Sequence, residues 1–178
     1  MSRLVNLLLV VILFYSCAAD VKESTVKSPD GSIEVKFWLE SGKPYYSAKF
    51  KNEDVINPSL LGMVLADGDT LSDKLKIIDS KSKTVNESWE QPWGAEKSVN
   101  NNYNEYAVSL AESDGEQREF QIEFRVFDDG VGFRYLIGEQ ANLKEFVIMD
   151  ELTEFVMSDN HDAWWIPAYG DQRYEYLF

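Results

Sequence analysis

One-by-one alternation of apolar and polar residues constrains the fold of this chain more than any other feature of its sequence. The alternation covers residues 33–39 and 120–126, and a return run follows each of them, at 46–50 and 133–137. Successive side chains of a β-strand point to opposite faces of the sheet, so each run predicts a strand with one buried face. Asp128-Asp129-Gly130 joins the second pair of runs and predicts a hairpin in which Gly130 takes a positive φ.

The remaining apolar segments are shorter, and most of them also predict strands. The continuous run Leu60–Leu65 predicts a short strand that is covered on both faces. Only residues 70–75 and 142–150 have a composition that suits short helices. Weaker strand candidates are Val55-Ile56, Ile77-Ile78, Tyr106–Leu110 and Phe146–Met149. Strands that recur every 8 to 12 residues or so, with Gly and Asp turns between them, predict an all-β fold, an antiparallel β-sandwich.

The first seventeen residues predict an export signal that is not part of the fold. Arg3 precedes Leu7–Tyr15, an unbroken run of nine apolar residues, and small residues follow. Nine residues are too few to cross a bilayer as a helix, which takes about 20. Two cleavage sites remain open: one before Cys17, whose thiol would then carry a lipid, and one after Ala18.

Cys17 is the only cysteine, so no disulfide can form within the chain. We divide the chain into a signal that ends at Cys17 (residues 1–17), a polar tether (18–27) and a β-sandwich domain (28–178). A lipid on Cys17 would hold the domain at a membrane surface, and this anchor is the only membrane contact that we expect.

The charge of the chain argues against nucleic acid as a partner. The sequence contains 17 basic and 31 acidic residues, and its net charge at pH 7 is −14. Proteins that bind nucleic acid place lysine and arginine against several phosphates, and no basic patch of this kind is present in the sequence. The excess of carboxylates suits a hard cation such as calcium.

Residues for self-contained catalysis are scarce. His161 is the only histidine and Cys17 belongs to the signal, which argues against a Ser-His-Asp or Cys-His arrangement and against a zinc site. Asp128 and Asp129 resemble the paired acids of glycoside hydrolysis, but at a hairpin tip we expect solvated turn formers. His161 lies in a polar loop, where we expect it to be exposed and inert.

Aromatic residues gather in two places. One group is Trp89, Trp93 and Tyr103, and the other is the stretch 164–178. Aromatic faces stack on the apolar faces of sugar rings, so both groups suit a carbohydrate surface. The alternative is that these rings fill the core of the sandwich and place their polar atoms at its edge.

Several segments together resemble glycoside hydrolase family 97. They occur in the family's order from about residue 26 to the end of the chain, so the resemblance covers nearly all of the mature chain. The segments are Ser28–Gly31 leading into Ile33–Val35, Trp89–Gly94, Asn102–Glu105, Phe124–Tyr135 and Trp165–Pro167.

The resemblance implies the N-terminal domain of a bacterial exo-acting α-glucosidase or α-galactosidase. Members of the family have an N-terminal β-super-sandwich, a (β/α)8 catalytic barrel and a small C-terminal sheet. The catalytic carboxylates lie in the barrel, so we expect no catalytic residue in this chain, and we expect the sandwich to be incomplete and truncated before the barrel.

The resemblance also implies a calcium site that the two domains share, with Glu175 as the ligand from this chain. Trp164, Trp165 and Tyr169 would lie near the pocket for an α-linked oligosaccharide. The expected partners are carbohydrate and the protein's own catalytic barrel, and the expected location is the periplasm or the outer membrane. The alternative function is a stand-alone, lipid-anchored glycan-binding module.

Overall fold

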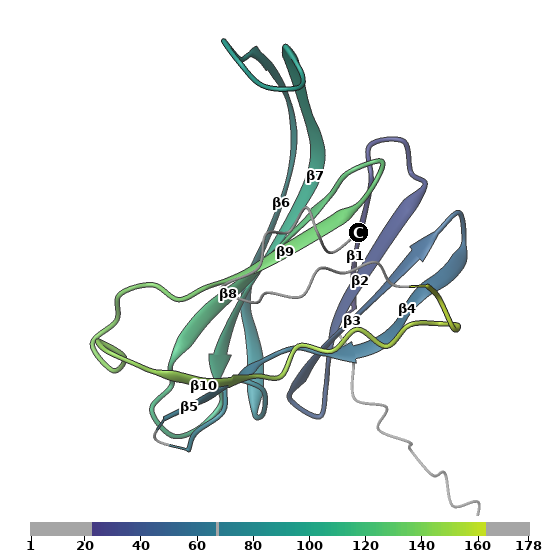
Figure 1. Ribbon diagram of the computed structural model, residues 1–178. Coiled ribbons are helices and arrows are strands. Elements are labelled where there is room, and N and C mark those ends of the chain that lie inside the picture. The colour runs from purple at the N-terminus through teal and green to yellow at the C-terminus, as the bar shows by residue number, and fades with distance from the viewer. Residues whose placement is uncertain (1–22, 67, 163–178) are drawn as a thin grey trace, which may run out of the picture.

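The computed structural model describes residues 23–66 and 68–162 (Figure 1). The strands are β1 (Ser24–Lys27), β2 (Ile33–Glu40), β3 (Lys43–Phe50), β4 (Glu53–Leu60), β5 (Met63–Leu65), β6 (Leu75–Glu90), β7 (Ser98–Glu112), β8 (Glu119–Val126), β9 (Val131–Leu136) and β10 (Ile148–Glu151). All of their pairings are antiparallel. The described part of the chain contains no helix, so the predicted all-β class is confirmed.

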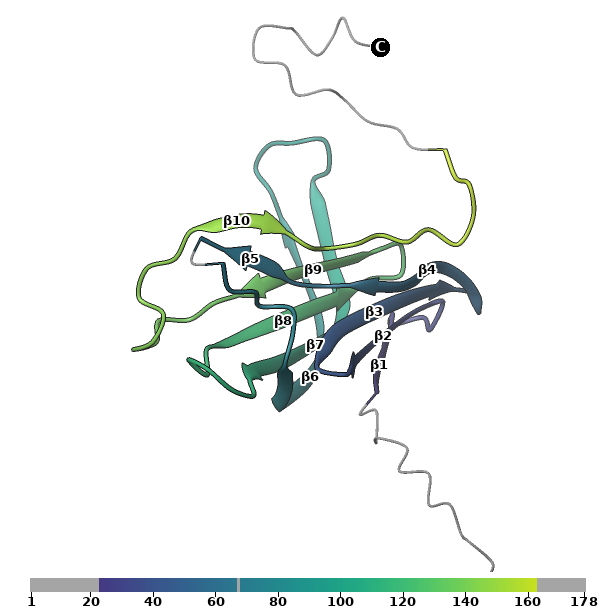
Figure 2. The same ribbon diagram turned by 90° about the horizontal axis from the view of Figure 1, so that it is seen from below.

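Two four-stranded sheets face each other and enclose the core (Figures 1 and 2). Their strand orders are β1-β2-β3-β4 and β6-β7-β8-β9, and β5 forms a small separate ladder with β10. Phe37 of β2 and Tyr46 of β3 meet Phe124 of β8 at ring distances of 6.0 and 6.1 Å. These buried rings stand at the alternating positions that predicted one buried face for each strand, and the antiparallel sandwich is confirmed.

Both hairpins predicted from the alternation are present. β2 pairs with β3 from Ile33↔Phe50 to Glu40↔Lys43, and β8 pairs with β9 across the Asp128-Asp129-Gly130 turn. The amide of Phe127 donates to the carbonyl oxygen of Gly130 at 2.8 Å. The predicted positive φ at Gly130 was wrong, because Gly130 is not among the glycines with a positive φ.

The strand predicted over Leu60–Leu65 is interrupted by Gly62. β4 ends at Leu60, β5 begins at Met63, and Gly62 between them has a φ of +144°. A Cβ at this position would lie 2.3 Å from the Cβ of Ser72, so only glycine fits. The amide of Gly62 donates to the hydroxyl of Tyr135 at 2.9 Å, which ties the junction to β9.

Neither of the two predicted helices forms. Residues 70–75 begin with a β-bridge between Thr70 and Val64, and the second segment, 142–150, runs into β10. The amide of Leu71 donates to Met63 and the amide of Ala66 donates to Val147, each at 2.9 Å. Strand neighbours thus use the backbone groups that a local helix would use, and tertiary pairing overrides local preference.

The chain after β10 continues along the outer side of β4 and β5. The amides of Leu152 and Glu154 donate to the carbonyls of Gly62 and Leu60 at 2.9 Å, and the amide of Asn57 donates to Val156 at 2.8 Å. Ile56 and Met157 form a β-bridge. Residues 148–158 therefore form the outermost described row beside the β4 edge, as Figure 2 shows.

β6 and β7 form a hairpin that is much longer than the short strands predicted at 77–78 and 106–110. Their pairing runs from Leu75↔Glu112 to Glu90↔Ser98, whereas β8 pairs with β7 only as far as Asn104. Residues 85–103 therefore leave the sheet as a two-stranded arm, which projects from the body in Figure 1. Among the described residues there is no helix with the length and apolar character that crossing a membrane requires.

Candidate functional site

The site residues predicted from the sequence lie outside the described residues. These are Cys17 near the N-terminus and, beyond Asp162, the residues Trp164, Trp165, Tyr169 and Glu175. Within the described residues, no group of three or more His, Cys, Asp or Glu side chains is arranged to hold a metal ion. His161 is exposed, as predicted.

A strip of exposed apolar side chains leads directly to the segment that carries those predicted residues. We call it the edge strip, and it consists of Phe146, Val147, Ile148, Met149, Phe155, Val156 and Met157. Their side chains are 40–66% exposed. Clustered apolar exposure of this kind is uncommon on a soluble monomer and marks an interaction surface.

The backbone beneath the edge strip is firmly attached to the sandwich. The hydroxyl of Tyr46 donates to the carbonyl oxygen of Glu154 at 2.9 Å, and the ring of Phe155 lies 6.1 Å from that of Phe133. A hollow of about 640 Å³, lined partly by Phe146 and Val147, adjoins the strip. The strip is thus a fixed surface that offers apolar contact and no chemistry of its own.

The mid-chain aromatic residues fall into two environments. Tyr103 is buried at the base of the arm, where its ring packs on Phe127 at 5.0 Å. Trp89 and Trp93 lie on the arm and are 47% and 84% exposed. Tyr103 is not part of the sandwich core, because it is buried between Phe127 and Arg125 on the same face of β7 as Glu105. The core-filling alternative is therefore wrong for all three residues, and the two tryptophans are available for contact.

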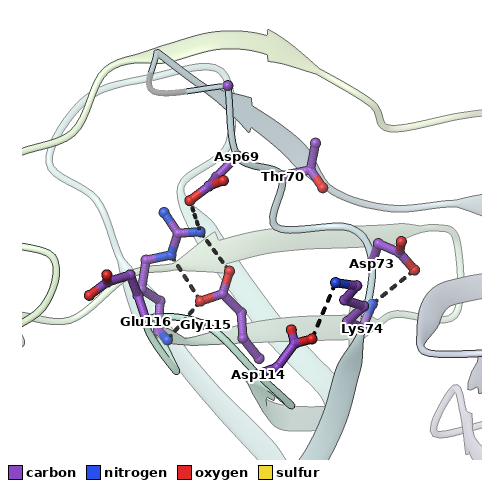
Figure 3. A pocket seen from close by; sticks show the side chains of 10 residues that line it. Asp69, Thr70, Asp73, Lys74, Asp114, Gly115 and Glu116 are labelled. Carbon is purple, nitrogen blue, oxygen red and sulfur yellow. Dashed lines mark hydrogen bonds and ion pairs between the residues drawn. The ribbon is translucent and has the colours of Figure 1, made fainter.

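A polar hollow of about 450 Å³ lies at the opposite end of β7 from the arm, around the buried guanidinium of Arg118 (Figure 3). Nη2 of Arg118 lies 2.6 Å from Oε1 of Glu112 and 2.9 Å from Oδ2 of Asp69. Its Nε donates to Oε2 of Glu112 at 2.9 Å. The nearby Lys74 and Asp114 form another ion pair at 3.2 Å. These paired charges join the β5–β6 connection to β7 and β8, which is a structural role.

A ladder of alternating charges crosses the outer face of the β6–β9 sheet. Glu105 of β7 accepts from Lys83 at 2.8 Å and from Arg125 at 3.1 Å. Glu123 of β8 pairs with Arg125 at 2.9 Å and with Arg134 at 3.0 Å. Both glutamates are buried beneath the long cationic side chains. We call these five residues the charge ladder.

The charge ladder shifts the acidity of its members. Burial by itself would raise the pKa of Glu123, but the hydrogen bond from Arg134 and the charge of Arg125 outweigh it, and the pKa is lowered. The hydrogen bond to Glu105 raises the pKa of Lys83. Glu123 is held ionised by the cations on both sides of it, whereas a general acid needs a raised pKa. The ladder is therefore an ion-pair network and not a catalytic pair.

Two segments that carried the family resemblance lie against each other. The amide of Asp30, in the turn after β1, donates to Oδ1 of Asp128 at 2.8 Å. Hydrogen bonds from the Ser28 hydroxyl and the Ser32 amide hold the pKa of Asp30 well below its usual range. Asp128 and Asp129 are exposed in the hairpin turn, as expected for turn formers. Asp128 therefore fastens one turn to another.

Comparison with known proteins places the chain in a family. The family description that matches is "Glycosyl-hydrolase 97 N-terminal", and the match extends over residues 26–178. The chain belongs to glycoside hydrolase family 97. The resemblance inferred from the sequence is thereby confirmed, and the chain is an N-terminal domain of that family.

The relatives of this family 97 domain are much longer than the chain. A retaining alpha-galactosidase of Bacteroides thetaiotaomicron is 24% identical over 163 residues, which are 92% of this chain and 23% of that protein. The chain thus spans less than a quarter of the length of this curated relative.

Solved structures agree in fold. A family 97 enzyme from Pseudoalteromonas sp. strain K8, solved with panose and also with acarbose, is 40% identical, with a TM-score of 0.76. The match covers 82% of this chain and 22% of that enzyme. A beta-arabinopyranosidase structure is 24% identical with a TM-score of 0.68, covers 75% of this chain and 21% of that protein, and shares the fold.

Sequence reasoning missed the edge strip as a functional feature, and it named Trp89 and Trp93 without predicting that they stand on an extended two-stranded arm. Phe146–Met149 is a run of four apolar residues, and we considered it as a strand or a helix without asking what would cover it. Such a run beside a strand that is already paired on its other side signals a surface that needs a partner. The arm offered no comparable signal, because its residues do not alternate clearly between apolar and polar.

Proposed function

We propose that this chain is the N-terminal domain of an exo-acting α-glycosidase, an α-glucosidase or an α-galactosidase, and packs on a catalytic barrel that lies outside the chain. Membership of family 97 and the panose and acarbose complexes of the Pseudoalteromonas relative support the α-glycosidase assignment. The retaining alpha-galactosidase relative supports galactosides as the other substrate class.

The edge strip is the observation that carries the packing step. Its seven apolar side chains are exposed on a rigid backbone, and they immediately precede the segment with the predicted site residues. Burial of apolar surface stabilises association by roughly 25 cal/mol per Å². A catalytic barrel seated on this strip would cover these side chains.

Within this proposal, Glu175 contributes one carboxylate to a calcium ion at the interface of the two domains. Calcium takes six to eight oxygen ligands, so a single glutamate is insufficient and the other ligands would come from the barrel. Bound calcium would supply positive charge that polarises oxygens of the substrate. Trp164, Trp165 and Tyr169 would form one wall of the sugar pocket.

Export belongs to the same proposal. Residues 1–17 act as the signal, and a lipid on Cys17 anchors the enzyme on the periplasmic side or at the outer membrane. Growth of the expressing bacterium with radiolabelled palmitate checks this assignment. Label should appear on the chain and should be absent from the Cys17→Ser variant.

A fusion protein tests the enzymatic role directly. In it, residues 23–178 replace the corresponding N-terminal part of the Pseudoalteromonas enzyme, and we call it the fusion below. The fusion should release p-nitrophenol from p-nitrophenyl α-glucoside in the presence of calcium, whereas the 178-residue chain alone should release none. Release by the chain alone would contradict the proposal.

Glu175→Gln in the fusion tests the calcium ligand. We expect this variant to need more calcium for half-maximal activity and to lose at least about tenfold in rate, because loss of a charged ligand costs more than about 1.4 kcal/mol. Glu40→Gln, on an exposed glutamate at the end of β2, is the matched control. Equal calcium dependence of the two variants would remove Glu175 from the site.

The exposure of Trp93 favours a second candidate, a stand-alone lipid-anchored glycan-binding module. The coding sequence beyond codon 178 separates the two functions. A continuing barrel sequence supports the enzyme domain, and an intergenic region together with glycan binding by the chain alone supports the module.

A further inference from the structure

The arm formed by residues 85–103 has two different faces. Cross-strand pairs Val85↔Tyr103 and Trp89↔Val99 lie on one face, together with Glu87 and Asn101, which bond each other at 2.7 Å. The other face carries pairs of small polar residues, which are Asn86↔Asn102, Ser88↔Asn100 and Glu90↔Ser98. The first face is therefore the more apolar side of the arm, and Trp93 lies in the loop at the tip.

The tip is a built structure that presents Trp93 to solvent. The amide of Gln91 donates to the carbonyl oxygen of Lys97 at 2.9 Å, and its side-chain nitrogen donates to Glu96 at 3.0 Å. Gly94 turns the chain with a φ of +131°. These bonds close the loop around Trp93, whose ring is 84% exposed.

The base of the arm is also fixed. Tyr103 packs on Phe127, and the guanidinium of Arg125 lies 4.9 Å from the centre of the Tyr103 ring. The side-chain amide of Asn104 donates to the carbonyl oxygen of Lys27 at 2.8 Å. The arm therefore leaves the sandwich in a set direction, although no third strand among the described residues supports its outer part.

An unsupported two-stranded hairpin is only marginally stable in water, and two tryptophans on it gain from being covered. In Figure 2 the arm and β10 lie on the same side of the two main sheets. Figure 1 shows the arm and β10 at opposite ends of that side, so a single folded body would meet both only if it spans the length of the sandwich. The net charge of −14 disfavours a second copy of this chain as that body.

We propose that the arm is a clasp that grips the catalytic barrel, with Trp93 as its outer anchor and Trp89 as its inner one. This inference rests on the proposed function, because it names the same barrel as the partner. A sugar is the weaker alternative for the arm. On the face of Trp89 the polar side chains of Glu87 and Asn101 bond each other, and the amides of Asn86, Asn100 and Asn102 lie on the opposite face, so few polar groups remain to bind a sugar that stacks on Trp89.

Hydroxyl-radical footprinting of the fusion tests the clasp residue by residue. The rate of Trp93 oxidation in the folded fusion is compared with its rate in the same protein unfolded in urea. If nothing covers Trp93, its ring is 84% exposed and should be oxidised nearly as fast in the folded fusion as in the unfolded one. If the arm grips the barrel, we expect Trp93 to be protected several-fold or more in the absence of sugar. Phe50, which is exposed in the β3–β4 hairpin, serves as the internal reference and should stay accessible.

The outcomes separate this inference from the proposed function. A fusion that hydrolyses substrate while Trp93 oxidises at its unfolded rate overturns the clasp alone. Protection that appears only with panose points to a sugar site, and protection that grows with protein concentration points to a second copy; each overturns the clasp. A fusion that shows neither hydrolysis nor protection overturns both proposals.

Two variants complete the test. Trp93→Ala should lower the thermal midpoint of the fusion by a few degrees and speed proteolytic cleavage within the arm, because the anchor is lost. Phe50→Ala removes an exposed apolar ring of similar kind away from the arm and should leave both measurements unchanged. Equal behaviour of the two variants would contradict the clasp.

Discussion

Gly62 is the residue through which the chain passes from the main sheet, β1–β4, to the β5–β10 ladder. Its φ of +144° is strained for any residue with a side chain, and Ser72 occupies the place of a Cβ. The Gly62 amide also donates to Tyr135, so a shift of the backbone would break a bond to β9. Both constraints act on one position, and neither can be relieved by rotation of a side chain.

Gly62→Ala should therefore destabilise the fold by roughly 3 kcal/mol, the sum of backbone strain and a steric clash. Urea unfolding followed by tryptophan fluorescence measures the loss. Gly130→Ala is the matched control, because Gly130 has no positive φ and nothing lies near its added methyl group. A variant Gly62→Ala as stable as the control would show that the junction is not so constrained.

The charge ladder acts at the scale of the element, because each of its ion pairs joins neighbouring strands of the β6–β9 sheet. Cross-strand pairs of opposite charge stabilise a sheet, and burial of the carboxylates strengthens the attraction. The lowered pKa of Glu123 means that the folded state holds this side chain ionised more strongly than the unfolded state does. Its contribution to stability is complete above its unfolded pKa and is lost as pH falls through its folded pKa.

Glu123→Gln should consequently reduce the dependence of stability on acid pH. Below about pH 4, where free glutamates protonate, the thermal midpoint of the parent should fall further than that of the variant. At neutral pH the variant should be less stable by about 1–2 kcal/mol, since hydrogen bonds to a charged group are lost. Glu40→Gln, on an exposed glutamate, should retain the full acid sensitivity. Parallel pH profiles for all three proteins would show that Glu123 does not contribute to the acid sensitivity of the fold.

At this scale the sequence predicts some elements well and others poorly. The hairpins of β2–β3 and β8–β9 were predictable because one face of each strand packs into the core, which imposes strict alternation on 33–39 and 120–126. The outer part of β6–β7 has solvent on both faces, so nothing imposes alternation on residues 85–103. The run 146–149 is apolar at every position, and such a pattern does not distinguish a strand from a helix.

The candidate site was predictable only in part, for a related reason. The family resemblance followed from segments such as 28–31 and 124–135. These two segments contact each other in the structure, where the amide of Asp30 donates a hydrogen bond to the carboxylate of Asp128. The exposure of Trp93 and of the edge strip depends on which neighbours surround them in three dimensions. Residue identity alone does not contain that information.

The arm should be dispensable for folding of the sandwich. Replacement of residues 86–102 by Asn-Gly would reconnect β6 and β7 by a tight turn beyond their pairing with β8, and the core residues stay in place. The shortened fusion should therefore retain the strand content of the parent, measured by circular dichroism. The surface of the barrel that the clasp covers in the parent should become accessible to oxidation by hydroxyl radicals. Loss of the strand signal itself would show that the arm is part of the folding unit.

At the scale of the whole molecule, the described residues form a closed core and leave an apolar strip exposed beside it. The two main sheets bury their facing side chains. The edge strip is exposed, and most of it belongs to residues 148–158, the outermost described row next to β4. Apolar side chains next to a sheet edge promote association with other chains when nothing covers them. We therefore expect the 178-residue chain to aggregate when it is expressed alone and to be stabilised when a barrel is attached.

Val147→Lys combined with Met149→Lys tests that expectation from both sides. The two side chains are 61% and 66% exposed, so lysines there should not disturb the core. In the chain alone, positive charge beside a sheet edge opposes aggregation, and light scattering should show a larger monomer fraction. In the fusion, the same lysines would be buried against the barrel, and the thermal midpoint and hydrolysis rate should both fall. Val131→Lys, on an exposed valine of β9, changes charge elsewhere and should have neither effect. A double variant that improves solubility without weakening the fusion would mean that the edge strip faces solvent in the enzyme and that the barrel seats on another surface.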